Sequence, residues 1–314
     1  MRLAAFIQFS APSFGVMALL LAVPLLYAIY LSLIQCTDVL ELVTVRLQTP
    51  FGIEELTTQR AKVGVDGLPE QFCKFVWLDQ YVSVLSSEFA KALQFTMLYV
   101  LVTVPIVIIG GLILALAVNQ LPVGIRGFAI GAAILPFIVT PLVGALSVKW
   151  LFRDDGLVTQ LVSAFGMQIY WMAQAWSARL LVILYGIWHS LPFAFIVLFA
   201  GLQSVPKDAL EAASLDGAST TQKLWYVTLP HLGPLVTFIL LIHTMDSYKL
   251  FEPVVVLTQG TFTESVQFVT YSILLDEGNP FKASAAAILT TIGIGVLLIP
   301  MLRRAVREHK EGAA

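Results

Sequence analysis

Long apolar segments without any charged residue alternate with polar segments along the whole chain. Several stretches of 20 residues or more contain no Asp, Glu, Lys or Arg. A helix needs roughly 20 apolar residues to cross about 30 Å of hydrocarbon, and these runs are too long for the short alternating strands of a membrane barrel. We therefore predict six transmembrane helices, at residues 11–34, 92–118, 128–150, 180–202, 233–257 and 283–302.

A further uncharged stretch, residues 156–178, differs from these six because Gln, Ser and Thr residues interrupt it. It also contains Tyr170, Trp171 and Trp176, and Tyr and Trp are enriched where a membrane meets water. We interpret this stretch as a helix along the membrane surface. The alternative, a seventh span, would reverse the side on which every later loop lies.

The composition is that of a chain surrounded by lipid. Hydrophobic residues make up 58% of the 314 residues and charged residues only 12%, whereas soluble domains average about 45–50% and about 25%. So little charge cannot cover the surface of a soluble domain, which excludes a cytosolic enzyme and a disordered chain. The net charge of −2 gives no electrostatic attraction to nucleic acid.

Basic residues predict the orientation. Arg303, Arg304, Arg307 and Lys310 follow the last predicted span directly, and loops rich in Lys and Arg remain in the cytoplasm. With six spans, both the N-terminus and the C-terminus are then cytoplasmic. We expect a single membrane domain with four parts: an N-terminal helix, an external loop, a helical core and a cytoplasmic tail. They cover residues 1–34, 35–89, 90–302 and 303–314.

Both cysteines, Cys36 and Cys73, lie in the predicted external loop. In an oxidising compartment such as a bacterial periplasm they could form a disulfide. Two separate thiols are the alternative, because geometry rather than spacing decides pairing. Two cysteines are too few for a disulfide scaffold or a four-cysteine zinc site on this chain.

The loop between the fourth and fifth predicted spans, residues 203–230, has the pattern of a folded segment. Residues 207–215 predict a short amphipathic helix, and Ser204 is placed to cap its N-terminus. Asp216-Gly217 is a turn signal that ends this helix.

Residues 218–227 predict a second short helix, which Pro230 would end before the fifth span begins. The loop is therefore expected to form an elbow of two helices joined at a glycine, on the cytoplasmic face.

This loop resembles a known motif. Glu211-Ala212-Ala213, Asp216-Gly217-Ala218 and Leu229-Pro230 are similar to the EAA motif of ABC importer permeases. The wider string over residues 200–232 resembles the carbohydrate-uptake branch of that family, the maltose and glycerol-phosphate type, and similar residues recur in order from about 77 to 302. The chain departs from the family pattern at Phe95 and at residues 259–262, away from the loop.

The resemblance implies an all-α membrane protein with six transmembrane helices, a cytoplasmic coupling-helix loop and a periplasmic loop between helices 1 and 2. It implies the permease subunit of an ATP-driven, binding-protein-dependent importer of a sugar or oligosaccharide in the bacterial inner membrane. The expected partners are a second permease in a heterodimer, two cytoplasmic ATPase subunits and a periplasmic substrate-binding protein. The sequence has no Walker-type phosphate loop, so we expect a separate ATPase to bind ATP-Mg and this chain to bind no cofactor.

In that family the elbow is a coupling helix that docks into a groove of the ATPase. The residues that the resemblance assigns to coupling are Glu211, Ala212, Ala213, Asp216, Gly217, Ala218, Leu229 and Pro230. Outside such a motif, Glu211 would be interpreted as an ordinary exposed acid on a solvated helix.

Polar and aromatic residues within the fourth and fifth predicted spans indicate a path for the solute. Asp246 lies close to the middle of the predicted span 233–257, where a charge costs at least about 2.5–3.5 kcal/mol unless it faces a wet cavity or a partner. Lys249 lies three residues later on the same helical face and could pair with it. The candidate path residues are Tyr185, Trp188, His189, Asp246, Tyr248 and Lys249. A buried ion pair and plain aromatic packing are the alternative interpretations.

Other functions have less support from the residues. The four histidines lack metal-ligand spacing, and we expect neither a metal site nor a catalytic group. A secondary transporter would leave the elbow unexplained, and an intramembrane enzyme would have only Asp246 and Lys249 to use. Among importers, one for a polyol, glycerol or a glycerol-phosphate compound is the second choice.

Overall fold

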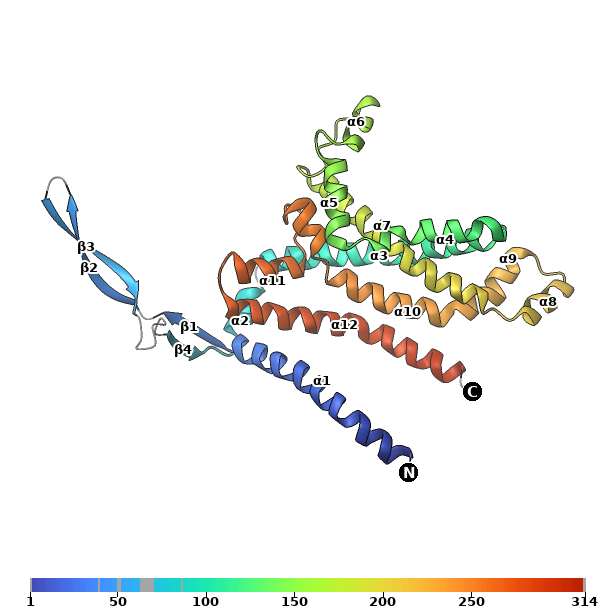
Figure 1. Ribbon diagram of the computed structural model, residues 1–314, viewed down its shortest axis with the longest axis horizontal. Coiled ribbons are helices and arrows are strands. Elements are labelled where there is room, and N and C mark those ends of the chain that lie inside the picture. The colour runs from blue at the N-terminus through green and yellow to red at the C-terminus, as the bar shows by residue number, and fades with distance from the viewer. Residues whose placement is uncertain (1, 39, 50–51, 63–70, 86, 313–314) are drawn as a thin grey trace. The chain divides into compact units, whose positions relative to one another are not determined.

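The computed structural model describes residues 2–38, 40–49, 52–62, 71–85 and 87–312 (Figure 1). The chain forms two compact units, residues 1–86 with 270–289 and residues 87–269 with 290–314. Within the described ranges, five helices are long and apolar enough to cross a membrane, and there are six candidate spans if the bent pair Val123–Ile138 and Pro141–Ala164 is counted as one. The predicted all-α membrane architecture is confirmed.

The first unit combines one long helix with two antiparallel strand pairs. Its elements are α1 (Arg2–Ser32), β1 (Ile34–Asp38), β2 (Leu40–Thr49), β3 (Gly52–Ala61), β4 (Gln71–Phe75) and α2 (Asp79–Val84). Strand β1 pairs with β4, and β2 pairs with β3. The Ser32 and Tyr81 hydroxyls, 2.7 Å apart, join the end of α1 to α2. The rest of the chain does not bury the apolar side chains of Ala11–Ser32, as a lipid-facing helix requires.

The two cysteines are joined by a disulfide in this unit. Antiparallel pairing of β1 with β4 places Cys36 opposite Cys73. Of the two alternatives that the sequence left open, the structure has the disulfide.

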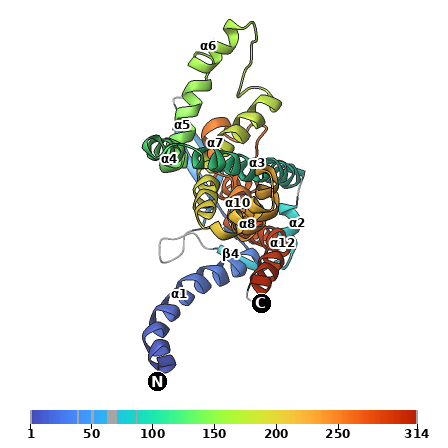
Figure 2. The same ribbon diagram turned by 90° about the vertical axis from the view of Figure 1, so that its right-hand side faces the viewer.

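The second unit is a bundle of helices. Its elements are α3 (Ser87–Asn119), α4 (Val123–Ile138), α5 (Pro141–Phe152), α6 (Leu157–Ala164), α7 (Ala175–Gln203), α8 (Lys207–Leu215), α9 (Thr220–Lys223), the π turn η1 (Leu224–Thr228), α10 (Leu229–Tyr248) and the π turn η2 (Val254–Thr258). Helices α11 (Val266–Leu275) and α12 (Pro280–Gly312) carry residues of both units. Helices α3, α4, α7 and α10 run side by side, whereas α5 and α6 turn away from α4 (Figures 1 and 2).

Small residues bring α3 and α7 close together. A Cβ atom added to Gly111 of α3 would lie 2.7 Å from the Cβ of Ala194 on α7, so only glycine fits at this crossing. Helices in lipid gain from such close contact because lipid tails are as apolar as the helices themselves. Phe195, Leu198 and Ile239 complete this fully buried cluster.

The predicted third span, residues 128–150, is not one straight helix. Helix α4 ends at Ile138 and α5 begins at Pro141, and the chain bends by 94° between the helical segments on either side. Pro141 has no N–H group to continue the helix, and a residue before proline disfavours the helical conformation. Val139 and Thr140 are extended as a result.

Two further predictions need correction. The fifth span was expected over 233–257, but α10 ends at Tyr248 and a separate π turn follows over Val254–Thr258. A helix was expected over 156–178, but only α6 is helical before α7 begins at Ala175. Gly166, at φ +82°, follows the end of α6 and turns the chain into a conformation that a helix cannot continue.

We predict that the disulfide joins strands β1 and β4 in the membrane-bound protein. A maleimide should label neither Cys36 nor Cys73 until a reductant is added, because both sulfur atoms are engaged. The Cys36→Ser variant is the control, since it leaves a free thiol at the exposed Cys73, which should react without reductant. Labelling of the unreduced wild-type protein would contradict the pairing.

Candidate functional site

The predicted elbow is present, and backbone hydrogen bonds fix its turn. Helix α8 has the predicted bounds. At its end the Gly217 N–H donates to Ser214 O (3.1 Å) and the Ala218 N–H donates to Ala213 O (2.9 Å). This pair of bonds is the Schellman motif, which needs a left-handed residue at its centre, and Gly217 has φ +75°.

A capping box starts the second helix of the elbow. The Gln222 N–H donates to Ser219 Oγ, and the Ser219 N–H donates to Gln222 Oε1 at 2.7 Å. Lys223 Nζ then donates to Ser214 Oγ at 2.8 Å and joins the second helix to α8. The Ser-Thr-Thr-Gln string is the sequence signature of this box, so the capping box was predictable from the sequence alone.

Two local predictions about the elbow are wrong. Ser204 does not cap α8; its hydroxyl donates to Gly201 O at the end of α7 (2.8 Å), and Pro206 occupies the N-cap position of α8. Pro230 does not end the second helix, because a π turn precedes it, in which the Leu229 N–H donates to Leu224 O. The wider turn absorbs the missing N–H of Pro230, and the helix continues from Thr220 to Tyr248.

The elbow projects from the ends of α7 and α10 (Figure 1). Glu211, Ala212 and Asp216 are exposed. Three large apolar side chains beside the motif are exposed as well: Leu215 (90%), Trp225 (63%) and Tyr226 (80%). Grouped exposed apolar residues with charged neighbours are typical of a surface that contacts another protein.

A second candidate site is a cavity of about 470 Å³ inside the second unit. It lies among α3, the break between α4 and α5, α7 and the end of α10. Of the predicted path residues, Tyr185, His189, Asp246 and Lys249 line it. The other lining residues were not selected from the sequence as path residues; among them are Tyr99, Phe137, Ser190, Phe193, His243 and Glu252.

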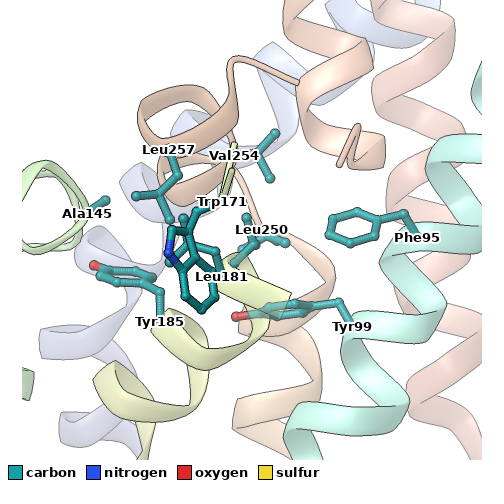
Figure 3. Close-up of a cluster of buried hydrophobic side chains, with 10 residues drawn as sticks. Phe95, Tyr99, Ala145, Trp171, Leu181, Tyr185, Leu250, Val254 and Leu257 are labelled. Atoms are coloured by element: carbon teal, nitrogen blue, oxygen red, sulfur yellow. The ribbon is translucent and has the colours of Figure 1, made fainter. Parts of the chain in front are cut away.

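Two cavity residues on α7 hold the break in the third span. The Tyr185 hydroxyl donates to Pro141 O at 2.7 Å, and His189 Nε2 lies 3.3 Å from Val139 O. An apolar cluster adjoins this point, and Figure 3 shows Tyr185 and Tyr99 in it together with Ala145 and Trp171. Polar side chains that line the cavity therefore lie next to a cluster of buried, mostly apolar side chains.

Asp246 lies elsewhere in its helix than predicted. It is three residues from Lys249, which caps the end of α10, rather than in the middle of a longer span. Both side chains are exposed, and in the described part of the chain no hydrogen bond or ion pair within 4.0 Å joins them. A charge at a helix end beside a cavity costs less than a charge that faces lipid at the centre of a span.

Two predicted path residues, Tyr248 and Trp188, are not among the residues that line the cavity in the described part of the chain. Tyr248 is buried between α3 and α12, against Val100 and Val104. A Cβ atom at Gly293 would lie 2.2 Å from the Tyr248 hydroxyl oxygen, so that glycine makes room for the phenol. Trp188 is 44% exposed on α7, with its ring 6.0 Å from that of Tyr185.

Comparison with known proteins agrees with this fold. Residues 81–307 match the family described as binding-protein-dependent transport system inner membrane component. The trehalose/maltose transport system permease protein MalF of Thermococcus litoralis is 31% identical over 72% of this chain and 77% of its own length. The arabinooligosaccharides transport system permease protein AraP of Halalkalibacterium halodurans is 28% identical over 76% of each chain.

A solved structure has the same fold. The crystal structure of a bacterial ABC transporter involved in the import of the acidic polysaccharide alginate aligns with a TM-score of 0.68 and 24% identity, over 74% of this chain and 84% of that chain. The bacterial alginate transporter in complex with its alginate pentasaccharide-bound periplasmic protein gives the same TM-score. Because the family match covers most of the chain, this protein belongs to the family of binding-protein-dependent transport system inner membrane components, the permeases of ABC importers.

Proposed function

We propose that this chain is one permease subunit of an ATP-driven importer for a sugar or oligosaccharide. In this proposal the cavity is part of the solute path, and the loop 203–230 couples that path to an ATPase. The observation that carries the proposal is the uninterrupted helix from Thr220 to Tyr248, which joins the exposed elbow directly to the lining of the cavity.

The elbow has the properties that coupling requires. Its turn is fixed by hydrogen bonds at Gly217 and Ser219, so a push on α8 moves the second helix with it. Glu211 is exposed for donors on an ATPase, and Leu215 and Tyr226 offer apolar area that would be buried on docking.

The cavity has the chemistry expected for a saccharide. Asp246 and Glu252 supply carboxylate oxygens that accept from hydroxyl groups, and Lys249 supplies a donor. The rings of Tyr185 and Phe193 give flat apolar surfaces for the C–H faces of a sugar ring. The volume of about 470 Å³ falls within the range of roughly 300–1,000 Å³ that is common for small-molecule sites.

The relatives support a carbohydrate as the solute. Their names give arabinooligosaccharides and trehalose or maltose, and the similar structure imports alginate. A polyol, glycerol or a glycerol-phosphate compound is the second candidate. The proposed assembly contains a second permease, two cytoplasmic ATPases that bind ATP-Mg, and a periplasmic binding protein, with both termini of this chain in the cytoplasm.

Glu211→Lys is expected to reduce uptake to background and to lower the amount of ATPase that copurifies with the permease. The substitution reverses the charge presented to the ATPase and leaves the membrane spans untouched. Asp208→Lys, the same reversal one turn earlier on α8, is the matched control and should retain most uptake. Wild-type uptake by Glu211→Lys would refute the coupling role.

Gly217→Val and Gly217→Asn should separate backbone strain from side-chain bulk. No atom lies within 4 Å of a Cβ at this position, so the cost comes from the left-handed backbone, about 1–2 kcal/mol for a residue other than Gly or Asn. The valine variant should therefore lose ATPase copurification and uptake, whereas the asparagine variant should keep both. Equal behaviour of the two variants would show that the turn is not what holds the ATPase.

Asp246→Leu is expected to raise the KM for uptake while the transporter still assembles. Losing a hydrogen bond to a charged group costs about 1.5–3 kcal/mol, which is roughly a ten- to hundredfold rise in KM. Asp276→Leu, at an exposed acid elsewhere in the chain, is the control and should leave KM unchanged. Unaltered uptake kinetics in Asp246→Leu would remove this residue from the path.

A further inference from the structure

The break between α4 and α5 leaves the carbonyl group of Val139 outside both helices, next to the first carbonyl group of α5, Pro141 O. Val139 and Thr140 are extended, with ψ of 129° and 144°, and Pro141 contributes no N–H group. Inside a membrane span, carbonyl groups at such a break need donors from neighbouring segments.

The donors come from two consecutive turns of α7. Tyr185 donates its hydroxyl hydrogen to Pro141 O at 2.7 Å, and one turn later His189 Nε2 lies 3.3 Å from Val139 O. The two side chains thus hold both sides of the bend from one neighbouring helix.

A glycine in α5 makes the first of these contacts possible. A Cβ atom at Gly144 would lie 2.9 Å from the Tyr185 hydroxyl oxygen, which is closer than Cβ atoms normally approach other atoms. Gly144 and Ala145 are the buried residues of α5, and the three atoms nearest to a Cβ atom at Gly144 belong to side chains of α7. Gly144 is not among the cavity-lining residues in the described part of the chain.

Tyr185 and His189 also line the cavity, together with Ser190. We infer that Tyr185 and His189 are positioning residues: they hold the bend between α4 and α5, so the angle of the bend and the shape of the cavity change together. Any group that enters the cavity and accepts a hydrogen bond from the Tyr185 hydroxyl or from His189 Nε2 takes a donor away from the bend.

The inference adds a mechanical role to residues that the proposed function treats only as solute contacts. The consequence for transport rests on the proposed function. If the cavity is part of the solute path, a solute bound there alters the arrangement of α4 and α5 at the bend. The bend itself is measured without a solute, so a failure of this inference is distinguishable from a failure of the transport assignment.

The first measurement is the distance across the bend. Spin labels on Gly124→Cys in α4 and Ser147→Cys in α5 report it by double electron–electron resonance in the full transporter. Tyr185→Phe, which loses only the hydroxyl, and Gly144→Ala should each shift or broaden the distance distribution. Gly131→Ala in α4, where a Cβ meets nothing within 4 Å, is the control and should match the wild type.

The second measurement is the shape of the cavity. The rate at which a methanethiosulfonate reagent labels Ser190→Cys should change about two- to tenfold in the Gly144→Ala background, the change expected for loss of one hydrogen bond. The Gly131→Ala background should leave the rate unchanged. His189→Leu should alter the rate as well, and His189→Gln, which retains an N–H donor, should restore it.

The outcome is decisive in either direction. Altered distances and altered labelling rates in the Gly144→Ala background support the inference, because Gly144 does not line the cavity and an added Cβ atom comes closest to the Tyr185 hydroxyl, at 2.9 Å. Unchanged distances in both Tyr185→Phe and Gly144→Ala would overturn it. A changed distance with an unchanged labelling rate would also overturn it, since the bend would then be independent of the cavity.

Discussion

A carbonyl group that leaves its helix inside a membrane must find a donor within the protein, because no water is there to supply one. In this chain Val139 O lies outside both helices at the break, 3.3 Å from His189 Nε2, and the Tyr185 hydroxyl donates to Pro141 O in the first turn of α5. The direction in which α5 and α6 leave the bundle follows from this arrangement. So does the cavity, since the side chains that satisfy the break also form part of its wall.

The elbow depends on a different kind of interaction, one confined to a few residues in sequence. The Schellman turn at Gly217 and the capping box at Ser219 satisfy the backbone groups that two short helices leave open. Lys223 then connects the second helix to Ser214 on the first. A segment of this kind keeps its shape while projecting from the bundle, and that stiffness is what a docking element needs.

Several local features were predictable from the sequence, although the roles of Ser204 and Pro230 were not, and contacts between distant segments were not predictable. The bounds of α8 and the turn at Gly217 follow from side-chain pattern and backbone preference. The donors at the break lie 44 and 50 residues away from the carbonyls that they meet, so no local pattern announces them. Glu252 was missed for the related reason that α10 ends earlier than its apolar pattern indicates.

The π turn before Pro230 affects how far along the helix a small tilt at one end displaces residues. Because the wider turn lets the helix pass the proline, the 29 residues from Thr220 to Tyr248 form one continuous helical segment, roughly 43 Å long at 1.5 Å per residue. A tilt of about 5° at one end displaces the other by roughly 4 Å, more than the diameter of a water molecule. A proline that ended the helix would have confined such a rotation to the elbow.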